Sequence, residues 1–149
     1  MKKIFSLLCI LLILLSFSAC SRIEETDAKE VANTLIEYIE QGDYDSATNL
    51  FCANEDDGKS FSDFLNEVET ETGFDFQSNI KILGYSEYNS ALNTYFGAVC
   101  ADFNINVIID GEEMMVQVGV LENEGALECY WFVICAPNSD YEFLCDYID

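Results

Sequence analysis

The sequence predicts an α+β domain in which three N-terminal helices pack on one face of a curved antiparallel meander sheet of about four strands. Two observations predict this class. Apolar residues recur at helical spacing in three segments before residue 74, whereas the segments after residue 78 are rich in alternating β-branched and aromatic residues. In addition, Asp110 and Gly111 form a strong two-residue hairpin signal between two of these strand segments.

Composition limits the domain count and the partners. The chain has 149 residues, 28 acidic against 6 basic side chains, no histidine and a formal charge of −22, which leaves room for one domain. Such a charge repels phosphate backbones, so a nucleic-acid partner is excluded. Half of the residues are apolar, including 11 Phe and 8 Tyr, so a packed core is expected rather than a disordered acidic tail.

The first 19 residues have the features of a signal peptide. Lys2 and Lys3 precede an apolar run over residues 4–15, which is shorter than the roughly 20 residues of a membrane-spanning helix. Small residues directly before Cys20 make this segment resemble a bacterial lipoprotein signal, although Phe17 stands where Leu is usual. The resemblance implies that Cys20 is acylated, with palmitate-type chains, and becomes the first residue of the mature protein. The alternative is an ordinary signal peptide cut near Ala19, with an unmodified Cys20.

Acylation at Cys20 would determine both domain boundaries and localisation. Residues 1–19 are then the signal peptide, 20–26 the lipidated cysteine and a short tether, 27–136 the domain and 137–149 a C-terminal tail. Two acyl chains hold a protein on a membrane without a spanning helix. We therefore expect a protein of the bacterial cell envelope, anchored on the extracytoplasmic side of a membrane through Cys20.

The first helix is expected from Asp27 to Gly42. Asp27 followed by Glu30 is a capping-box-like start, and Gly42 is a typical stop. The apolar residues of this segment fall on one helical face; they are Val31, Leu35, Tyr38 and Ile39.

Two further helices follow. Asp43 is the expected cap of the second, whose apolar face holds Tyr44, Ala47, Leu50 and Phe51. The acidic loop over residues 54–57 fails the spacing of a calcium loop and is interpreted as a solvated turn. Ser60 with Asp63 starts the third helix, which ends at Gly73 and buries Phe61, Phe64, Leu65 and Val68.

The strands are expected over residues 79–88, 95–109, 112–121 and 127–135. The Asp110-Gly111 turn pairs Ile109 with Glu112, and this register makes every inward pair apolar: Val107 with Met114, Ile105 with Val116, Phe103 with Val118 and Ala101 with Val120. The opposite face then carries Asp102, Asn104, Asn106 and Gln117.

The last strand is apolar on both faces, so both of its faces should be covered. The candidates for the second cover are the tail over residues 141–144, a homodimer through the sheet face, or another partner. Two registers are open. Pairing Leu121 with Ala126 sends Trp131 into the core and Glu128 outward, and we favour it; pairing Leu121 with Leu127 turns Glu128 inward, where burial would raise its pKa and suit a general base.

At this point the chain resembles a known family. Residues 34–47, a helix, a Gly-Asp-Tyr step and a second helix ahead of the sheet, resemble the opening of nuclear transport factor 2-like domains, and Trp131 fits their common ending. The resemblance covers about residues 27–135. It implies a pocket between helices and concave sheet, which relatives use for small-molecule binding, for isomerase or dehydratase chemistry, or only as a dimerising scaffold.

Candidate catalytic residues are few. Enzymatic relatives place an Asp or His in the pocket, but this chain has no histidine and the register directs Asp102 away from the apolar face. Glu128 and Tyr130 remain, together with Tyr38 and Tyr44.

The cysteines leave two alternatives open. Five remain after Cys9 and Cys20 are set aside, and a disulfide between Cys135 and Cys145 would fasten the tail. The other alternative is buried thiols in an organism that lives without oxygen. No CxxC occurs and no histidine completes a zinc set, so no metal and no cofactor are expected.

Two functional classes follow. The favoured one is a non-enzymatic, lipid-anchored binding or interaction module outside the cytoplasm, with a ligand that the sequence does not identify. The alternative is a small isomerase- or hydratase-type enzyme that uses a pocket carboxylate and a tyrosine.

Overall fold

A computed structural model describes residues 22–52, 60–77, 79–93, 97–135 and 142–146, the last range as backbone only. The predicted signal peptide, Cys20 and the acidic loop lie outside the described residues. The helices are α2 (Glu25–Gln41), α3 (Tyr44–Thr48) and α4 (Phe61–Thr72), and the strands are β1 (Ile80–Asn93), β2 (Ala98–Ile109), β3 (Glu112–Asn123), β4 (Ala126–Cys135) and β5 (Glu142–Asp146). The strands form one antiparallel sheet in the order β1-β2-β3-β4-β5.

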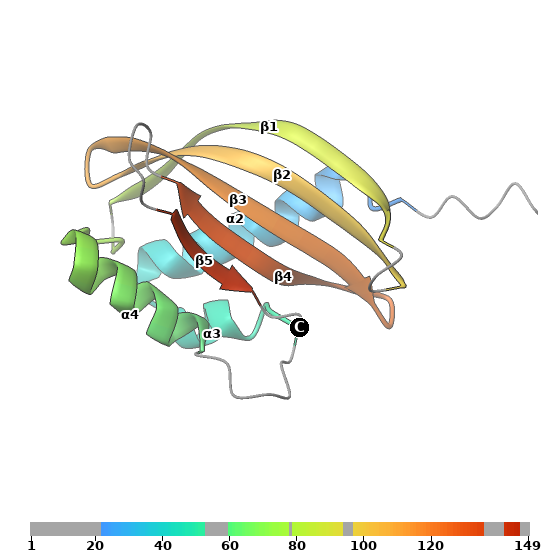
Figure 1. The fold of residues 1–149 in the computed structure, drawn as a ribbon, viewed down its shortest axis with the longest axis horizontal. Helices are drawn as coiled ribbons and strands as arrows, with labels where there is room; N and C mark the ends of the chain where they lie inside the picture. Colours follow the sequence, from blue (N-terminus) through green and yellow to red (C-terminus); the bar gives the residue numbers. More distant parts are fainter. Residues whose placement is uncertain (1–21, 53–59, 78, 94–96, 136–141, 147–149) are drawn as a thin grey trace, which may run out of the picture.

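The helices lie together on one side of a curved sheet (Figure 1). Helix α2 runs behind the strands, while α3 and α4 lie beside the β4–β5 edge. This arrangement confirms the α+β class, the three helices and the antiparallel meander. We call the sheet surface that packs against α2 the inner face, and the opposite surface the outer face.

The sheet has one strand more than predicted. β5 comes from the expected C-terminal tail and pairs with residues 131–135 of β4. An unpaired β4 would leave a row of backbone donors and acceptors at the sheet edge, and β5 satisfies them over these residues. The β5 register sets Cys145 opposite Phe132 and Cys135 opposite Glu142. The Cys145 side chain lies outside the described residues, so the disulfide between Cys135 and Cys145 stays a prediction.

The predicted starts of the second and third helices are confirmed. The Asp43 carboxylate accepts a hydrogen bond from the Ser46 amide at 3.1 Å, and Ser60 with Asp63 forms a complete capping box. Helix α2 differs, because it begins at Glu25 and its N-cap residue, Glu24, makes no side-chain cap. The expected capping role of Asp27 is therefore wrong.

Part of the predicted tether is built into the domain. Ile23 is only 5 % exposed. Its amide donates to Ser90 Oγ at 3.0 Å, and its carbonyl accepts a hydrogen bond from the Tyr88 hydroxyl. Ile23, which the sequence assigned to the tether, is therefore packed against β1 by two hydrogen bonds.

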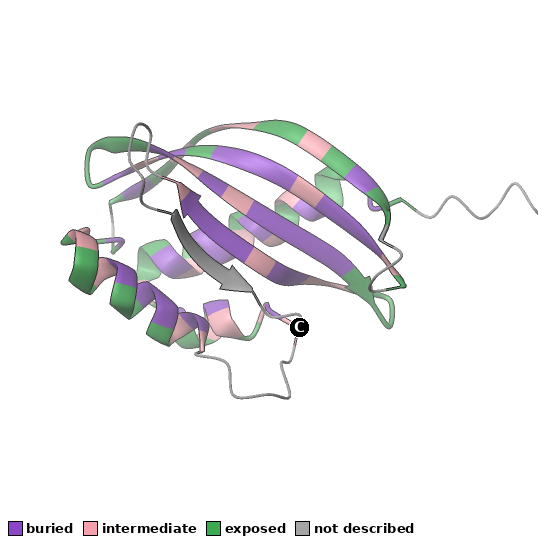
Figure 2. Cartoon of the chain, in the orientation of Figure 1, coloured by how far each residue is buried: buried purple, intermediate pink, exposed green. Residues whose placement is uncertain are grey.

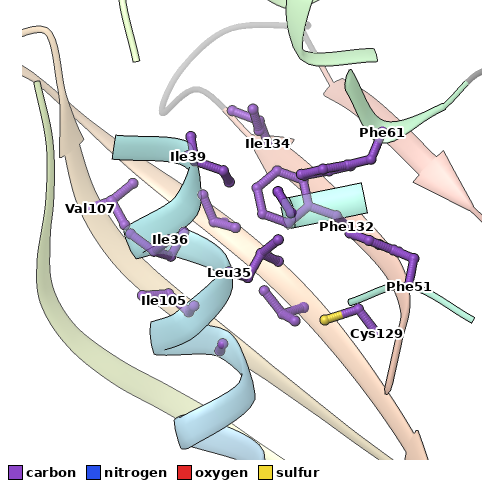
Figure 3. Close-up of a cluster of buried hydrophobic side chains, with 14 of the residues drawn as sticks. Leu35, Ile36, Ile39, Phe51, Phe61, Ile105, Val107, Cys129, Phe132 and Ile134 are labelled. Atoms are coloured by element: carbon purple, nitrogen blue, oxygen red, sulfur yellow. The ribbon is translucent and has the colours of Figure 1, made fainter. Parts of the chain in front are cut away.

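The core lies between the inner face and the helices (Figures 2 and 3). The β2–β3 register agrees with the prediction pair by pair, from Ile109 opposite Glu112 to Ala101 opposite Val120. Figure 3 shows the three α2 side chains at the centre of this layer packed among residues of the sheet and of the other helical segments; the set includes Leu35, Ile36, Ile39, Phe51, Phe61, Ile105, Val107, Cys129, Phe132 and Ile134. In the described part of the chain, apolar side chains therefore fill the layer between the centre of α2 and the inner face.

Candidate binding site on the outer sheet face

The β3–β4 hairpin has a register that neither prediction anticipated. Its turn is Glu124-Gly125, both with positive φ, so that Asn123 lies opposite Ala126 and Leu121 opposite Glu128. The pairing then shifts: Val120 lies opposite Cys129, but Gly119 lies opposite Trp131. Tyr130 is thus the extra residue of a β-bulge.

The bulge reverses the predicted place of Trp131. It keeps Cys129 on the inner face and returns Phe132 and Ile134 to the core, whereas Trp131 packs against the outer-face cluster. The prediction that Trp131 lies in the core is therefore wrong. Glu128 faces outward as favoured, where it accepts a hydrogen bond from Asn123 Nδ2 at 3.0 Å.

A carboxylate on β2 holds the two aromatic residues of the bulge. Asp102 Oδ1 accepts one hydrogen bond from Trp131 Nε1 at 2.9 Å and another from the Tyr130 hydroxyl. Asp102 is opposite Gly119, and Gly119 is opposite Trp131, so the three residues form a row across three strands. We call Asp102, Tyr130 and Trp131 the outer-face triad.

Gly119 makes the triad possible. A Cβ atom at this position would lie 1.6 Å from Trp131 Cδ1 and 1.7 Å from Trp131 Nε1. Because position 119 has no side chain, the indole extends across β3 at this point and reaches the Asp102 carboxylate on β2.

Polar and sulfur-containing neighbours surround the triad. Buried Cys100 and Leu121 pack with Tyr130 on one side. Further along β2, Asn104 is 8 % exposed and donates to Glu87 Oε2 at 2.7 Å. Glu87 has a φ of 56° in an irregular part of β1, where the register shifts between Ser86 and Asn89. The outer face thus presents amide, carboxylate and aromatic groups side by side.

The charge of Asp102 influences its neighbours. Burial, the hydrogen bond to Asp102 and the charge of Asp102 all raise the pKa of Tyr130, so the phenol keeps its proton and acts as a donor. Burial and the same charge raise the pKa of the Cys100 thiol to about 11. Cys100 is therefore a neutral thiol near pH 7 and not an activated nucleophile.

The other two tyrosine candidates, Tyr44 and Tyr38, make contacts that stabilise the fold. The Tyr44 hydroxyl donates to Glu69 Oε1 at 2.7 Å, and the Phe76 amide donates to the same oxygen at 3.2 Å. Burial and Glu69 raise the pKa of Tyr44, so its phenol also stays protonated. Tyr38 packs at the margin of the core. Of the predicted candidates, Tyr130 is the one that bonds to Asp102, and Asp102 itself was not among them.

In the described part of the chain, open grooves lie on both sides of α2. One of about 490 Å³ lies between α2 and the start of β1, with Glu37, Glu40 and Lys81 on its walls. The other, of about 400 Å³, lies between α2, Leu50 and Leu127. Neither groove is lined by a predicted site residue or by a member of the triad.

The described ranges hold neither a cluster of metal ligands nor a helix that could cross a membrane. No group of three or more His, Cys, Asp or Glu side chains in these ranges could hold a metal ion. Among the described helices, none is both long and apolar enough to cross a membrane.

Comparison of the chain with protein-family models, curated protein sequences and solved structures gives no match. The resemblance to nuclear transport factor 2-like domains therefore rests on the pattern of residues 34–47 and on the layout of helices and sheet.

Proposed function

We propose that this protein is a non-enzymatic binding module with a nuclear transport factor 2-like domain, held by a lipid on Cys20 at the extracytoplasmic side of a bacterial membrane. One observation carries the binding part of the proposal. The inner face is filled by apolar core residues, whereas the hydrogen-bonding groups of β2 and β4 gather on the outer face around Asp102. A ligand or partner would therefore meet the outer face.

The enzymatic alternative has less support. Glu128 is partly exposed and hydrogen-bonded to Asn123, a setting without the burial that would suit a carboxyl to act as a base. Tyr130 keeps its proton because its pKa is raised. A Glu128→Gln substitution that abolished turnover of a small carbonyl substrate would reverse this ranking.

The layout supports the family assignment. Helices precede a curved antiparallel meander and lie on one side of it, as the resemblance implies. A homodimer through the outer face is one form that such a module would take, and the mass of the purified protein in detergent would identify it.

The anchor has a direct test with a matched control. Cys20→Ser should move the protein from the membrane pellet to the soluble fraction, because it removes the acylated thiol. Cys9→Ser changes a cysteine inside the predicted signal peptide and should leave membrane retention and the mature mass unchanged. Full membrane retention of the Cys20→Ser protein would overturn the anchor, and the intact mass of the wild-type protein should show the acyl chains directly.

A further inference from the structure

We propose that the outer-face triad binds an organic cation, an ammonium or guanidinium group seated between the Asp102 carboxylate and the Trp131 ring. This inference rests on the proposed binding function and names the chemical class of its ligand.

The Asp102 carboxylate has unused capacity. Two aromatic donors, the Trp131 indole N–H and the Tyr130 hydroxyl, converge on Oδ1. Among the described residues, no donor reaches Oδ2. Since an ionised carboxylate accepts about four hydrogen bonds, Asp102 can accept more from a ligand.

The charge of Asp102 is not neutralised by a basic side chain in the described part of the chain. The ion pair found there joins Lys29 to Glu25 on α2, away from the outer face. A carboxylate that is partly removed from water and lacks a cationic partner favours the approach of a positive group.

Trp131 adds a second attraction for the same group. Its side chain is only partly buried, and its pyrrole edge lies against Gly119 beside Asp102. Cations bind favourably over aromatic rings, and tryptophan is the strongest such partner. A carboxylate next to an accessible indole is therefore a matched pair of contacts for an organic cation.

The net charge of the whole chain also favours a cation over an anion. With a formal charge of −22, the protein attracts cations from solution and repels phosphates and carboxylates. A second carboxylate on the outer face, Glu87, is already hydrogen-bonded to Asn104 and offers a matched control for general charge effects.

Trp131 is the only tryptophan in the chain, so its fluorescence reports directly on the site. We would titrate the mature protein, in neutral detergent and at constant ionic strength, with spermidine, with a trilysine peptide and with sucrose. We expect a saturable change in Trp131 emission with one of the two cations and none with sucrose. Saturation by spermidine alone identifies a free amine, and saturation by trilysine alone identifies a basic peptide segment.

Two variants test the assigned carboxylate. Asp102→Asn should weaken cation binding about tenfold or more, whereas Glu87→Gln should change it less than threefold. Equal weakening by the two variants, or none by Asp102→Asn, would overturn the proposal.

A measurement on the wild-type protein covers the case in which Asp102→Asn does not fold. The single indole N–H resonance should shift as the cation is added, because Trp131 Nε1 donates to the carboxylate that the cation contacts. A response to sucrose alone would overturn the cation and retain the binding module. The absence of a response to all three probes, both in fluorescence and in this resonance, would overturn the proposed cation-binding site. The fractionation of Cys20→Ser tests the anchor separately.

Discussion

Gly119→Ala should damage the outer-face triad more than any other single methyl group added to a glycine of the described sheet. The new Cβ would lie 1.6 Å from Trp131 Cδ1 and 2.6 Å from Tyr130 Cε1. Carbon atoms in contact are normally about 3.5–4.0 Å apart, so the indole would have to move by roughly 2 Å. The 2.9 Å hydrogen bond from Trp131 to Asp102 does not survive a displacement of that size.

The cost follows from the interactions that are lost. A hydrogen bond to a charged group contributes about 1.5–3 kcal/mol, and overpacking costs about 1–3 kcal/mol. Replacing a strand glycine by alanine returns about 0.5–1 kcal/mol of backbone entropy. We therefore expect the free energy of unfolding to fall by about 2–4 kcal/mol, which lowers the urea midpoint by about 1–2 M for a typical slope of about 2 kcal/mol per M.

Urea denaturation followed by Trp131 emission measures both effects. The native emission of Gly119→Ala should also move to longer wavelength, because the displaced indole becomes more exposed to water. Gly84→Ala is the control, since a Cβ at Gly84 meets no atom within 4 Å and its φ is not positive. A Gly119→Ala protein with the midpoint and emission of the wild type would refute the assigned packing of Trp131 on β3.

Two further predictions concern the helices and alkaline pH. Ser60→Ala removes the capping box of α4 and should cost about 1 kcal/mol in urea denaturation, whereas the neighbouring Ser62→Ala should cost much less; equal losses would contradict the cap. The free energy of unfolding should fall as pH rises from about 9, because the pKa of Cys100 is about 11 in the fold and its ordinary value is 9.0, so the unfolded chain releases its proton first. The raised pKa values of Tyr44 and Tyr130 extend the fall above pH 10, and a urea midpoint that is constant from pH 8 to 11 would contradict these assignments.

The β2–β3 hairpin was predictable because its turn and its pattern agree. Asp110 and Gly111 both have positive φ, which is the backbone geometry that a two-residue hairpin turn requires. A one-residue slip would have placed every apolar residue of β2 on the outer face, so the alternation and the turn admit the same single register.

The β3–β4 register was not predictable, because here the alternation of apolar residues and the turn do not agree on one register. β4 is apolar on both faces, so its alternation does not indicate which side is inward. The bulge at Tyr130 adds one residue to β4 relative to β3, and no turn signal in the sequence indicates it. Gly125 marks the turn in the same way as Gly111, and the glycine at position 119 in a strand rich in valine was the available sign that another residue comes close to β3.

The bulge allows one strand to serve two surfaces. It lets β4 direct Cys129, Phe132 and Ile134 into the core while Tyr130 and Trp131 go to the outer face. Burying the indole in the core would remove more apolar surface from water and stabilise the fold further. Its place on the outer face forgoes that stabilisation. A large aromatic residue that is partly exposed, held by a carboxylate and given room by a glycine has the character of a contact group at a binding surface. Because the bulge shifts the alternation of β4 by one residue, the sequence pattern alone placed Trp131 in the core. The same shift brings Trp131 to the outer face, where a ligand should be sought.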